Sequence, residues 1–486
     1  MSDIKRLAKH SSIYTIGNLL TKMVGFIMLP LYTHYLTPAD YGTLEIVMLA
    51  FPLITVFMGM GMSQATIRYY YDSDLSIDRK QVVGTALTTS IILSFLGSLF
   101  LIVISDQLSM LLFQESGYSY AIKLAVIALF FELSMEVPLS FIRVKEYSVL
   151  YVSISLIRLL LAVLLNILFL AYLNMSYEGI LYSSIITAGL EFIVLYSLTF
   201  KYCGFCFSVE KLKQMALYGY PLIFAGLGMI ILNLVDRYFL TIKTDLATVG
   251  LYAVSLKFAS LLSIGFIIPF WRSYGPFRFS IMNKPDAKVI YADVFRFFMV
   301  IVTWIGIGIA LLSRELIILM TGDEFWSAYD TVPLLVVGGV LYGIYYLTQT
   351  GIYIHKKTQY IAYIINVVAL FKIASSWYLI EYFNAQGAAL SVVLSFSLLT
   401  CITFIVSQRL YFIKYSWLSL IKTIFLGVVL YYLISQVVLD SVMFTLIVKS
   451  ILLLSFPVLV VFTGIITQDE FNKFKFNVAS FISSKL

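Results

Sequence analysis

Long apolar runs alternate with short polar connectors along almost the whole chain. A membrane-spanning helix needs about 20 mostly apolar residues, and about fourteen runs meet that requirement. They lie near residues 11–36, 42–69, 82–105, 119–141, 148–173, 179–201, 214–242, 249–275, 290–313, 327–353, 359–382, 386–411, 416–439 and 442–467. The widest connector, residues 275–290, is too short for a separate folded domain. The pattern therefore predicts an all-α integral membrane protein.

Composition leads to the same fold class. The 486 residues are 61% hydrophobic and only 12% charged, whereas soluble domains carry about 25% charged residues. An aqueous fold is excluded, because it would have to hide too much apolar surface. The first apolar run follows basic residues, as in a signal peptide, but it continues to Leu36 without a small-residue cleavage site. We interpret it as an uncleaved first span.

Basic residues gather on alternate connectors. One side carries Lys5, Arg6, Lys9, Arg79, Lys80, Arg143, Lys145, Lys201, Lys211, Lys213, Arg278, Lys284, Lys288, Lys356, Lys357, Arg409, Lys414, Lys473, Lys475 and Lys485. The other side carries mainly acidic residues, with Lys243 and Arg314 as its main cations. Because basic loops stay in the cytoplasm, both termini are predicted to be cytoplasmic. The net charge of +7 then follows from topology, and no nucleic-acid partner is expected.

The two halves of the chain resemble each other. Residues 144–179 align with residues 355–387, with Lys145 opposite Lys356 and Gly179 opposite Gly387. Upstream, Gly42 aligns with Gly250, 208 residues further on. Parallel repeats of this kind are typical of transporters that expose a central site to each side in turn. We predict an N-terminal lobe of six spans (1–210), a C-terminal lobe of six (211–412), and two additional helices with a cytoplasmic tail (413–486).

Polar and small residues recur every three or four positions in several spans, which places them on one face of each helix. The first span carries Ser11, Thr15, Asn18, Lys22 and Gly25. The fifth and eleventh carry Ser155, Arg158, Ala162 and Asn166, and Ala362, Asn366, Ala369, Lys372 and Ser376. The seventh carries Gly226, Asn233 and Arg237, and Lys257 lies within the eighth.

These stripes predict a wet cavity between the helices. A charge at membrane depth costs at least about 2.5–3.5 kcal/mol, so lipid-facing positions tolerate it poorly. Basic side chains in a cavity can hold a phosphate or pyrophosphate, and arginine binds two oxygens at once. The predicted substrate-binding residues are Lys22, Arg158, Lys257, Lys372, Arg237, Asn18, Asn166 and Asn366.

Acidic residues leave a second interpretation of the same charges open. Glu132, Glu136 and Glu191 could neutralise Arg158 or Lys22 in structural ion pairs, and Arg237 could extend to the membrane surface. The same carboxylates, together with Asp236, could instead carry a coupling ion, because burial favours a protonated carboxyl group. We therefore name Glu132, Glu136, Glu191 and Asp236 as candidates for coupling to a proton or sodium gradient.

Metal and disulfide chemistry are not expected. Cys203 and Cys206 form a single C-x-x-C, for which zinc would need further ligands. The three histidines, His10, His34 and His355, are far apart in the sequence. We predict no metal site, no cofactor and no enzymatic activity.

Three stretches carry a resemblance to a known family. They are LPLYTHYLTPADYGTLEIVMLAF from Leu29, GMGMSQATIRYYYDSD from Gly59, and VDRYFL from Val235. With the predicted fourteen helices in two six-helix lobes, they resemble the bacterial polysaccharide transporters, or O-antigen (Wzx-type) flippases. That family belongs to the multidrug/oligosaccharidyl-lipid/polysaccharide exporter superfamily, whose fold is MATE-like. None of the three stretches is a catalytic signature.

The resemblance implies a substrate and a location. Such a protein would move an undecaprenyl-pyrophosphate-linked oligosaccharide from the inner to the outer leaflet of the bacterial cytoplasmic membrane by alternating access. It would contact membrane lipids, and a polysaccharide polymerase and chain-length machinery would be its partners. The alternatives are a lipid II flippase or a multidrug exporter of the same superfamily. A membrane glycosyltransferase or polymerase is less favoured, because the outer loops are short.

Overall fold

The computed structural model describes residues 25–72 and 75–466, which form helices joined by short turns, with no strand in these ranges. Eleven helical stretches among them are long and apolar enough to cross a membrane by length and composition. The predicted all-α membrane fold is confirmed.

The predicted number of fourteen spans is not confirmed. One helix, α16 (Gln359–Leu410), covers two predicted spans and is interrupted at Asn384, where φ is 47°. Another, α10 (Val209–Lys243), covers the predicted seventh span but is not among the eleven stretches. The predicted first span lies mostly in residues 1–24, outside the described residues. The total therefore stays a prediction.

Internal contacts divide the chain into two compact units. Unit 1 comprises Met1–Ala253 and Ala369–Ala388, and unit 2 comprises Val254–Val368 and Ala389–Leu486. The predicted lobes 1–210 and 211–412 and the tail 413–486 were derived from the sequence repeat, which is a different criterion. Those boundaries stay a prediction.

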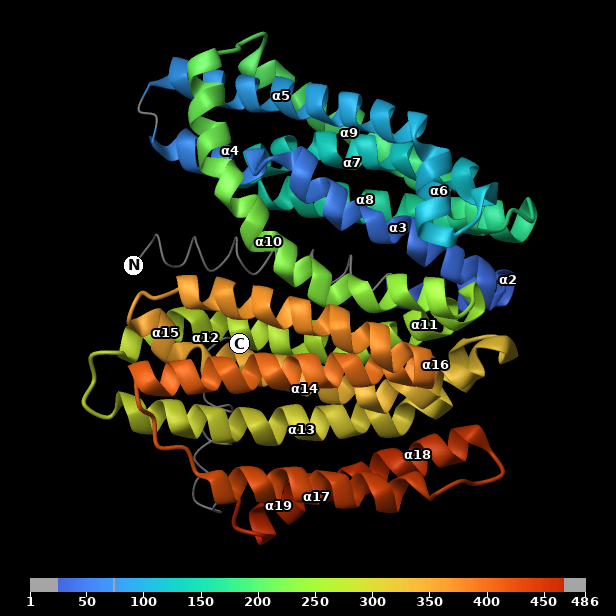
Figure 1. Ribbon diagram of the computed structural model, residues 1–486, viewed down its shortest axis with the longest axis vertical. Coiled ribbons are helices and arrows are strands. Elements are labelled where there is room, and N and C mark those ends of the chain that lie inside the picture. Colours follow the sequence, from blue (N-terminus) through green and yellow to red (C-terminus); the bar gives the residue numbers. More distant parts are fainter. Residues whose placement is uncertain (1–24, 73–74, 467–486) are drawn as a thin grey trace. The chain divides into compact units, whose positions relative to one another are not determined.

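Unit 1 is built around one central helix, α7 (Ser119–Val144). It contains α2 (Leu29–Tyr35), α3 (Pro38–Gly59), α4 (Met62–Asp72), α5 (Ser76–Val103), α6 (Ser105–Phe113), η1 (Ser116–Tyr118), α7, α8 (Ser148–Ile167), η2 (Leu168–Tyr172), α9 (Tyr177–Cys203), α10, the start of α11 (Leu246–Leu262) and part of α16. Figure 1 shows α5, α7, α8 and α9 running alongside one another, and α7 packs against α3, α4, α5, α8 and α9. Two-thirds of the most apolar stretch of α7 is buried, which explains its nearly continuous apolar sequence.

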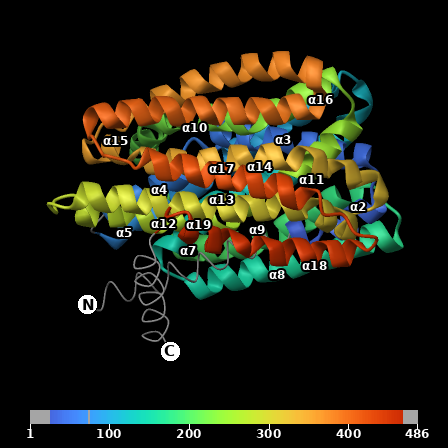
Figure 2. The same ribbon diagram turned by 90° about the horizontal axis from the view of Figure 1, so that it is seen from below.

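Unit 2 is built around α13 (Ala287–Met320). It contains the rest of α11, η3 (Ser263–Ile267), α12 (Ile268–Ile281), α13, η4 (Asp323–Thr331), α14 (Val332–Thr348), α15 (Thr350–Ile354), both ends of α16, α17 (Trp417–Ser435), α18 (Val442–Leu453) and α19 (Ser455–Phe462). α13 packs against α14, α17, α18 and α19, and Figure 2 shows α13 and α17 side by side. The last two predicted spans thus belong to this unit.

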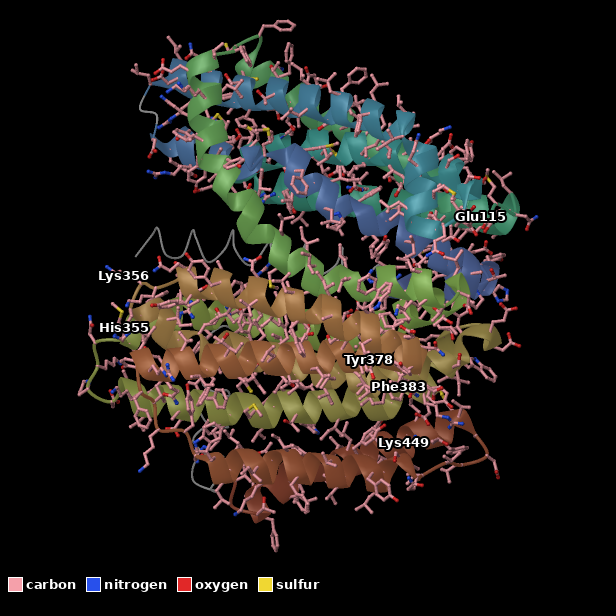
Figure 3. All side chains as sticks on the ribbon, viewed as in Figure 1. Glu115, His355, Lys356, Tyr378, Phe383 and Lys449 are labelled. Carbon is pink, nitrogen blue, oxygen red and sulfur yellow. The ribbon has the colours of Figure 1, made fainter. Side chains whose placement is uncertain are left out.

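A buried ion pair joins α18 to α13 within unit 2. Lys449 Nζ on α18 lies 2.7 Å from Glu315 Oε1 on α13, and both side chains are almost fully buried. Figure 3 labels Lys449 on its helix. Nearby, the indole of Trp304 donates a hydrogen bond of 3.1 Å to the Leu453 carbonyl. The charge of Lys449 in the apolar helix α18 is thus neutralised by a partner on α13.

Replacing Lys449 with methionine is expected to lower the free energy of unfolding by about 3 kcal/mol, the low end of the range for breaking a buried ion pair. The cost is moderated because Arg314 Nη1, 3.6 Å from Glu315, remains to oppose its charge. Thermal unfolding in detergent measures the effect. Lys422→Met removes the same charge from an exposed position on α17 and is the control. Equal unfolding temperatures for the two variants would mean that this contact does not form.

The motif LTPADYG explains how α3 begins. Thr37 and Asp40 form a capping box, in which the Thr37 side chain accepts from the Asp40 N–H and Asp40 accepts from the Thr37 N–H, and Pro38 occupies the first turn. At the start of α11, Asp245 accepts from the Thr248 N–H at 2.7 Å. Thr37 and Asp245 are 208 residues apart, the same separation as Gly42 and Gly250.

The two glycines Gly42 and Gly250 contact each other's helices reciprocally. A Cβ atom on Gly42 would overlap the Leu246 carbonyl, and one on Gly250 would overlap the Pro38 carbonyl. Pro38 and Leu246 are themselves 208 residues apart. A reciprocal contact of this kind is what two equivalent segments related by a two-fold axis make. It supports the repeat, and it explains why both positions lack a side chain.

The turns of the repeat match as well, with a shift of one residue. Glu146 and Lys356 both have positive φ, 55° and 57°. Each follows a helix end with the same hydrogen bonds, Tyr147 N to the Ile142 carbonyl and Lys357 N to the Ile352 carbonyl. The structural counterpart of Lys356 is therefore Glu146 and not Lys145, and the alignment of this region was one residue out of register. Asn174 and Asn384, with φ of 50° and 47°, keep the same offset of 210.

Candidate functional site

An arginine held between two carboxylates lies inside unit 1. Arg158 on α8 contacts Glu132 on α7 at 2.5 Å and Glu191 on α9 at 2.8 Å, each through a different guanidinium nitrogen. Arg158 was predicted to be a ligand and the two glutamates to be its possible neutralising partners, and the structure brings the three together. With one positive and two negative groups, this triad carries a formal charge of −1 when all three are ionised.

The Arg158 triad is only partly covered by protein. The side chains of Arg158 and Glu132 are 31% and 39% exposed, whereas Glu191 is 5% exposed. All three lie in helices that are long and apolar enough to span a membrane. Glu136 lies one turn further along α7 and faces the end of α3, where a Cβ on Gly59 would approach its carboxylate to 3.2 Å. It makes no ion pair with any described residue.

A second cluster joins α10, α11 and α16 within unit 1. Asp236 on α10 accepts a 2.7 Å hydrogen bond from the hydroxyl of Tyr252 on α11. Its carboxylate also lies 3.6 Å from the ammonium of Lys372 on α16, and neither charged side chain is more than 3% exposed. Lys372, predicted as a substrate ligand, and Asp236, predicted as a coupling residue, are thus partners in one buried pair. Their roles stay predictions.

The next residue of α10 makes a separate pair. Arg237 Nη1 lies 3.1 Å from Glu45 on α3, and Nη2 donates to the Asn233 carbonyl at 3.3 Å. Both charged side chains are about one-fifth exposed. Arg237 is therefore anchored to α3 by a carboxylate, which differs from the interpretation that it simply extends to the membrane surface.

The remaining predicted residues are spread over the chain. In unit 1, the Asn166 amide on α8 donates to the Tyr32 hydroxyl at 2.8 Å. In unit 2, Asn366 is exposed and donates to the Ala362 carbonyl of its own helix at 2.9 Å, and Lys257 is half-buried on α11. Lys22 and Asn18 lie outside the described residues. The Arg158 triad and the Asp236 pair are therefore the best-defined groupings of predicted residues.

Two members of these clusters were missed in the sequence. Glu45 is an acidic residue in the otherwise apolar run TLEIVMLAF, and an ionisable residue within a span is by default a functional candidate. That signal was available. Tyr252 was not identifiable, because the chain contains 35 tyrosines and many occupy the apolar spans. Among the described residues, no group of three or more His, Cys, Asp or Glu side chains is placed to hold a metal ion.

The profile of a protein family described as "Polysaccharide biosynthesis protein" matches residues 20–330, well over half of the chain. The chain belongs to this family. An uncharacterized membrane protein of Haemophilus influenzae is 24% identical over 368 residues, which cover 74% of this chain and 86% of the relative. The family profile extends over both units and includes every residue of the Arg158 triad and of the Asp236–Tyr252 hydrogen bond, whereas Lys372 lies beyond it.

Solved transporters share the fold. The lipid II flippase MurJ, in an inward closed conformation, superposes with a TM-score of 0.75, covering 93% of this chain and 99% of MurJ at 12% identity. An inward-facing multidrug resistance MATE transporter of the MOP superfamily gives 0.62, covering 84% and 97% at 16% identity. The predicted MATE-like fold is thus confirmed, and the matched family is one of polysaccharide biosynthesis. The many apolar helices and the membrane-protein neighbours support a multi-pass membrane protein.

Proposed function

We propose that the protein flips an oligosaccharide linked to undecaprenyl pyrophosphate from the inner to the outer leaflet of the bacterial cytoplasmic membrane by alternating access. The family supports a role in polysaccharide biosynthesis, and the fold supports transport. The observation that carries the choice of an anionic head group is Arg158, a partly exposed arginine within an apolar span. O-antigen, capsule and exopolysaccharide units all present the same pyrophosphate.

The exposed parts of the Arg158 triad must face water or substrate and not lipid. A charged group facing lipid costs at least about 2.5–3.5 kcal/mol, and Glu132 and Arg158 are both about one-third exposed. We therefore place the exposed edge of the triad on a hydrated cavity. A pyrophosphate that enters this cavity meets the Arg158 guanidinium. When no substrate is bound, that guanidinium is paired with Glu132.

Carboxylate and phosphate compete for the same guanidinium edges. Arginine presents parallel N–H donors that fit either group in a bidentate manner. When Glu132 or Glu191 is neutralised by a proton or paired with a sodium ion, Arg158 is released to bind the head group. This exchange couples substrate binding to an ion gradient and gives both glutamates a role beyond structural pairing. No further cofactor is needed.

Transport can be tested in liposomes with a fluorescent polyprenyl-pyrophosphate oligosaccharide and an impermeant sugar-cleaving enzyme that reports the outer leaflet. Wild type is expected to expose the sugar. Arg158→Ala is expected to slow this by about 10–100-fold, which corresponds to the loss of a charge-assisted hydrogen bond. Arg158→Lys keeps the charge but not the bidentate geometry and should fold and be slow, so the test does not depend on Arg158→Ala being stable.

Arg68→Ala is the matched control, because Arg68 pairs with Asp72 at an exposed helix end and such pairs contribute little. It should transport at the wild-type rate. Failure of wild type to move the lipid under imposed proton and sodium gradients, together with export of a cationic dye, would overturn the proposal in favour of a multidrug exporter.

A lipid II flippase is the second candidate, because MurJ superposes with a higher TM-score and coverage than the MATE transporter. The same assay with lipid II as cargo separates the two. Faster movement of lipid II than of every oligosaccharide tested would favour this candidate.

A further inference from the structure

In unit 2, α12 meets α14 and α15 along a regular polar seam. One stripe consists of residues three and four positions apart on α12, namely Trp271, Tyr274 and Arg278. The facing stripe, on α14 and α15, consists of Tyr346, Thr350 and Tyr353. Each residue of the α12 stripe faces one that lies 75 or 76 positions later in the chain, so α12 runs parallel to α14 and α15 and in register with them.

The three contacts of this seam are close. The rings of Trp271 and Tyr346 are 4.9 Å apart between centroids. The hydroxyls of Tyr274 and Thr350 are 2.8 Å apart. The Arg278 guanidinium lies 3.7 Å from the centroid of the Tyr353 ring. The seam therefore ends in a cation placed over an aromatic face.

Buried nitrogen donors along this seam have no acceptor among the described residues. They are Nε and Nη1 of Arg278, Nε1 of Trp271 and the side-chain amide nitrogen of Gln349. Gln349 joins α14 to α15, between the positions that contact Trp271 and Arg278. Arg278 and Gln349 are 3% and 2% exposed. No carboxylate of the described residues lies within ion-pair distance of Arg278. We refer to Trp271, Arg278 and Gln349 as the donor seam.

An acceptor ligand would satisfy the donor seam. Leaving a buried donor without a partner carries its full desolvation penalty, which is larger for a charged group, so buried polar groups in folded proteins are almost always paired. All the orphan atoms are N–H donors, and one of the groups is a guanidinium. The complementary ligand is an anion with several acceptor oxygens, and phosphate matches the arginine geometry.

The surroundings favour a phosphate on a lipid. Exposed lysines lie on the connectors at this end of unit 2, namely Lys284, Lys288, Lys356 and Lys357, and Figure 3 labels Lys356 beside His355 at the end of α15. The charge pattern assigns these connectors to the cytoplasm. Beside Arg278 on α12, Phe277 and Phe279 are 38% and 43% exposed and offer apolar surface to acyl chains. Basic pockets between helices on this side bind anionic head groups.

We propose that the donor seam binds a phosphoryl anion, supplied by the head group of an anionic phospholipid. The site lies in unit 2, on residues other than the Arg158 triad and the Asp236 cluster, and it does not depend on the proposed transport function. The phosphate accepts from the Arg278 guanidinium, and the amide of Gln349 and the indole of Trp271 complete the donor set. Bound lipid would tie α12 to α14 and α15 and stabilise the fold.

The full-length protein, delipidated in detergent, can be titrated with phosphatidylglycerol, phosphatidylcholine or inorganic phosphate while its thermal unfolding is followed. Phosphatidylglycerol is expected to raise the unfolding temperature, because it binds the folded state alone. Arg278→Gln should weaken the apparent affinity by about tenfold or more. Gln349→Leu should weaken it less and serves as an independent variant, should Arg278→Gln not fold. Lys213→Gln removes one exposed charge from α10, in unit 1, and should leave the affinity within about twofold, as expected for a screened surface charge.

The arms of the titration distinguish the outcomes. Stabilisation by phosphatidylglycerol alone identifies the lipid as the source, and an additional effect of inorganic phosphate shows that the seam also takes the free anion. Both support a phosphoryl site. Equal stabilisation by phosphatidylcholine, equal losses in Arg278→Gln and Lys213→Gln, or no effect of any phosphate compound would overturn it.

Discussion

Substituting alanine for Gly42 is expected to destabilise the protein by at least about 3 kcal/mol, the upper end of the cost of overpacking. The added Cβ would overlap the carbonyl group of Leu246. The backbone fixes the position of the Cβ, and the carbonyl that it meets is also backbone, so no side-chain rotation can relieve the overlap and α3 and α11 must separate. Thermal unfolding in detergent and the yield of membrane-inserted protein measure the effect. Transport should fall with the folded fraction.

Gly250→Ala should reproduce the result, because its Cβ would overlap the Pro38 carbonyl in the reciprocal contact. Gly189→Ala is the matched control, since its Cβ would lie 3.6 Å from the Phe131 ring, at an ordinary contact distance. If Gly42→Ala unfolds at the same temperature as Gly189→Ala, the helices do not cross this closely and the reciprocal contact is incorrect.

The start of α3 shows how much local chemistry the sequence could reveal. Thr37, Pro38 and Asp40 form a helix start that capping rules alone would place at the observed residue. Sequence comparison of the two halves paired Gly42 with Gly250, but it gave no reason for the glycines. The reason is the contact of each with the helix that carries the other, which involves residues about 200 positions apart and has no local signal.

The alignment of the turns failed by one residue for a physical reason. Lys145 and Lys356 look equivalent because both are basic residues at the end of a span. The backbone instead pairs Glu146 with Lys356, since both take positive φ after the helix end. Residue chemistry and backbone conformation are only loosely linked at such turns, so matching side chains misplaced the register.

Charge pairing was predictable in kind but not in detail. Glu132 and Glu191 were named as possible partners of Arg158 because apolar helices rarely leave a charge alone. Lys372 and Asp236 were given separate roles, as ligand and as coupling residue, because nothing in the sequence indicates that α16 and α10 place them together. Packing between helices distant in sequence decides that contact. The number of spans was also hard to predict, because α16 continues past Asn384 and only that one residue leaves the helical backbone conformation.

Replacing Lys372 with methionine is expected to cost about 3–5 kcal/mol of unfolding free energy, the range for breaking a buried ion pair. The Asp236 carboxylate would keep the Tyr252 hydroxyl, 2.7 Å away, but would lose its ammonium partner. The effect should exceed that of Lys449→Met, because Glu315 retains Arg314 nearby. Thermal unfolding of the two variants, measured under the same conditions, provides the comparison.

The double variant Lys372→Met/Asp236→Asn separates a structural role of the pair from a role in coupling. Removing both charges leaves no uncompensated group, and the amide can still bond to Tyr252, so most of the lost stability should return. We expect transport by this folded variant to lose its response to an imposed proton or sodium gradient, because the carboxylate that would exchange the ion is gone. A variant that regains stability and keeps the full gradient response would show that Asp236 and Lys372 only hold α10 to α16, which would leave Glu132 and Glu191 as the coupling candidates.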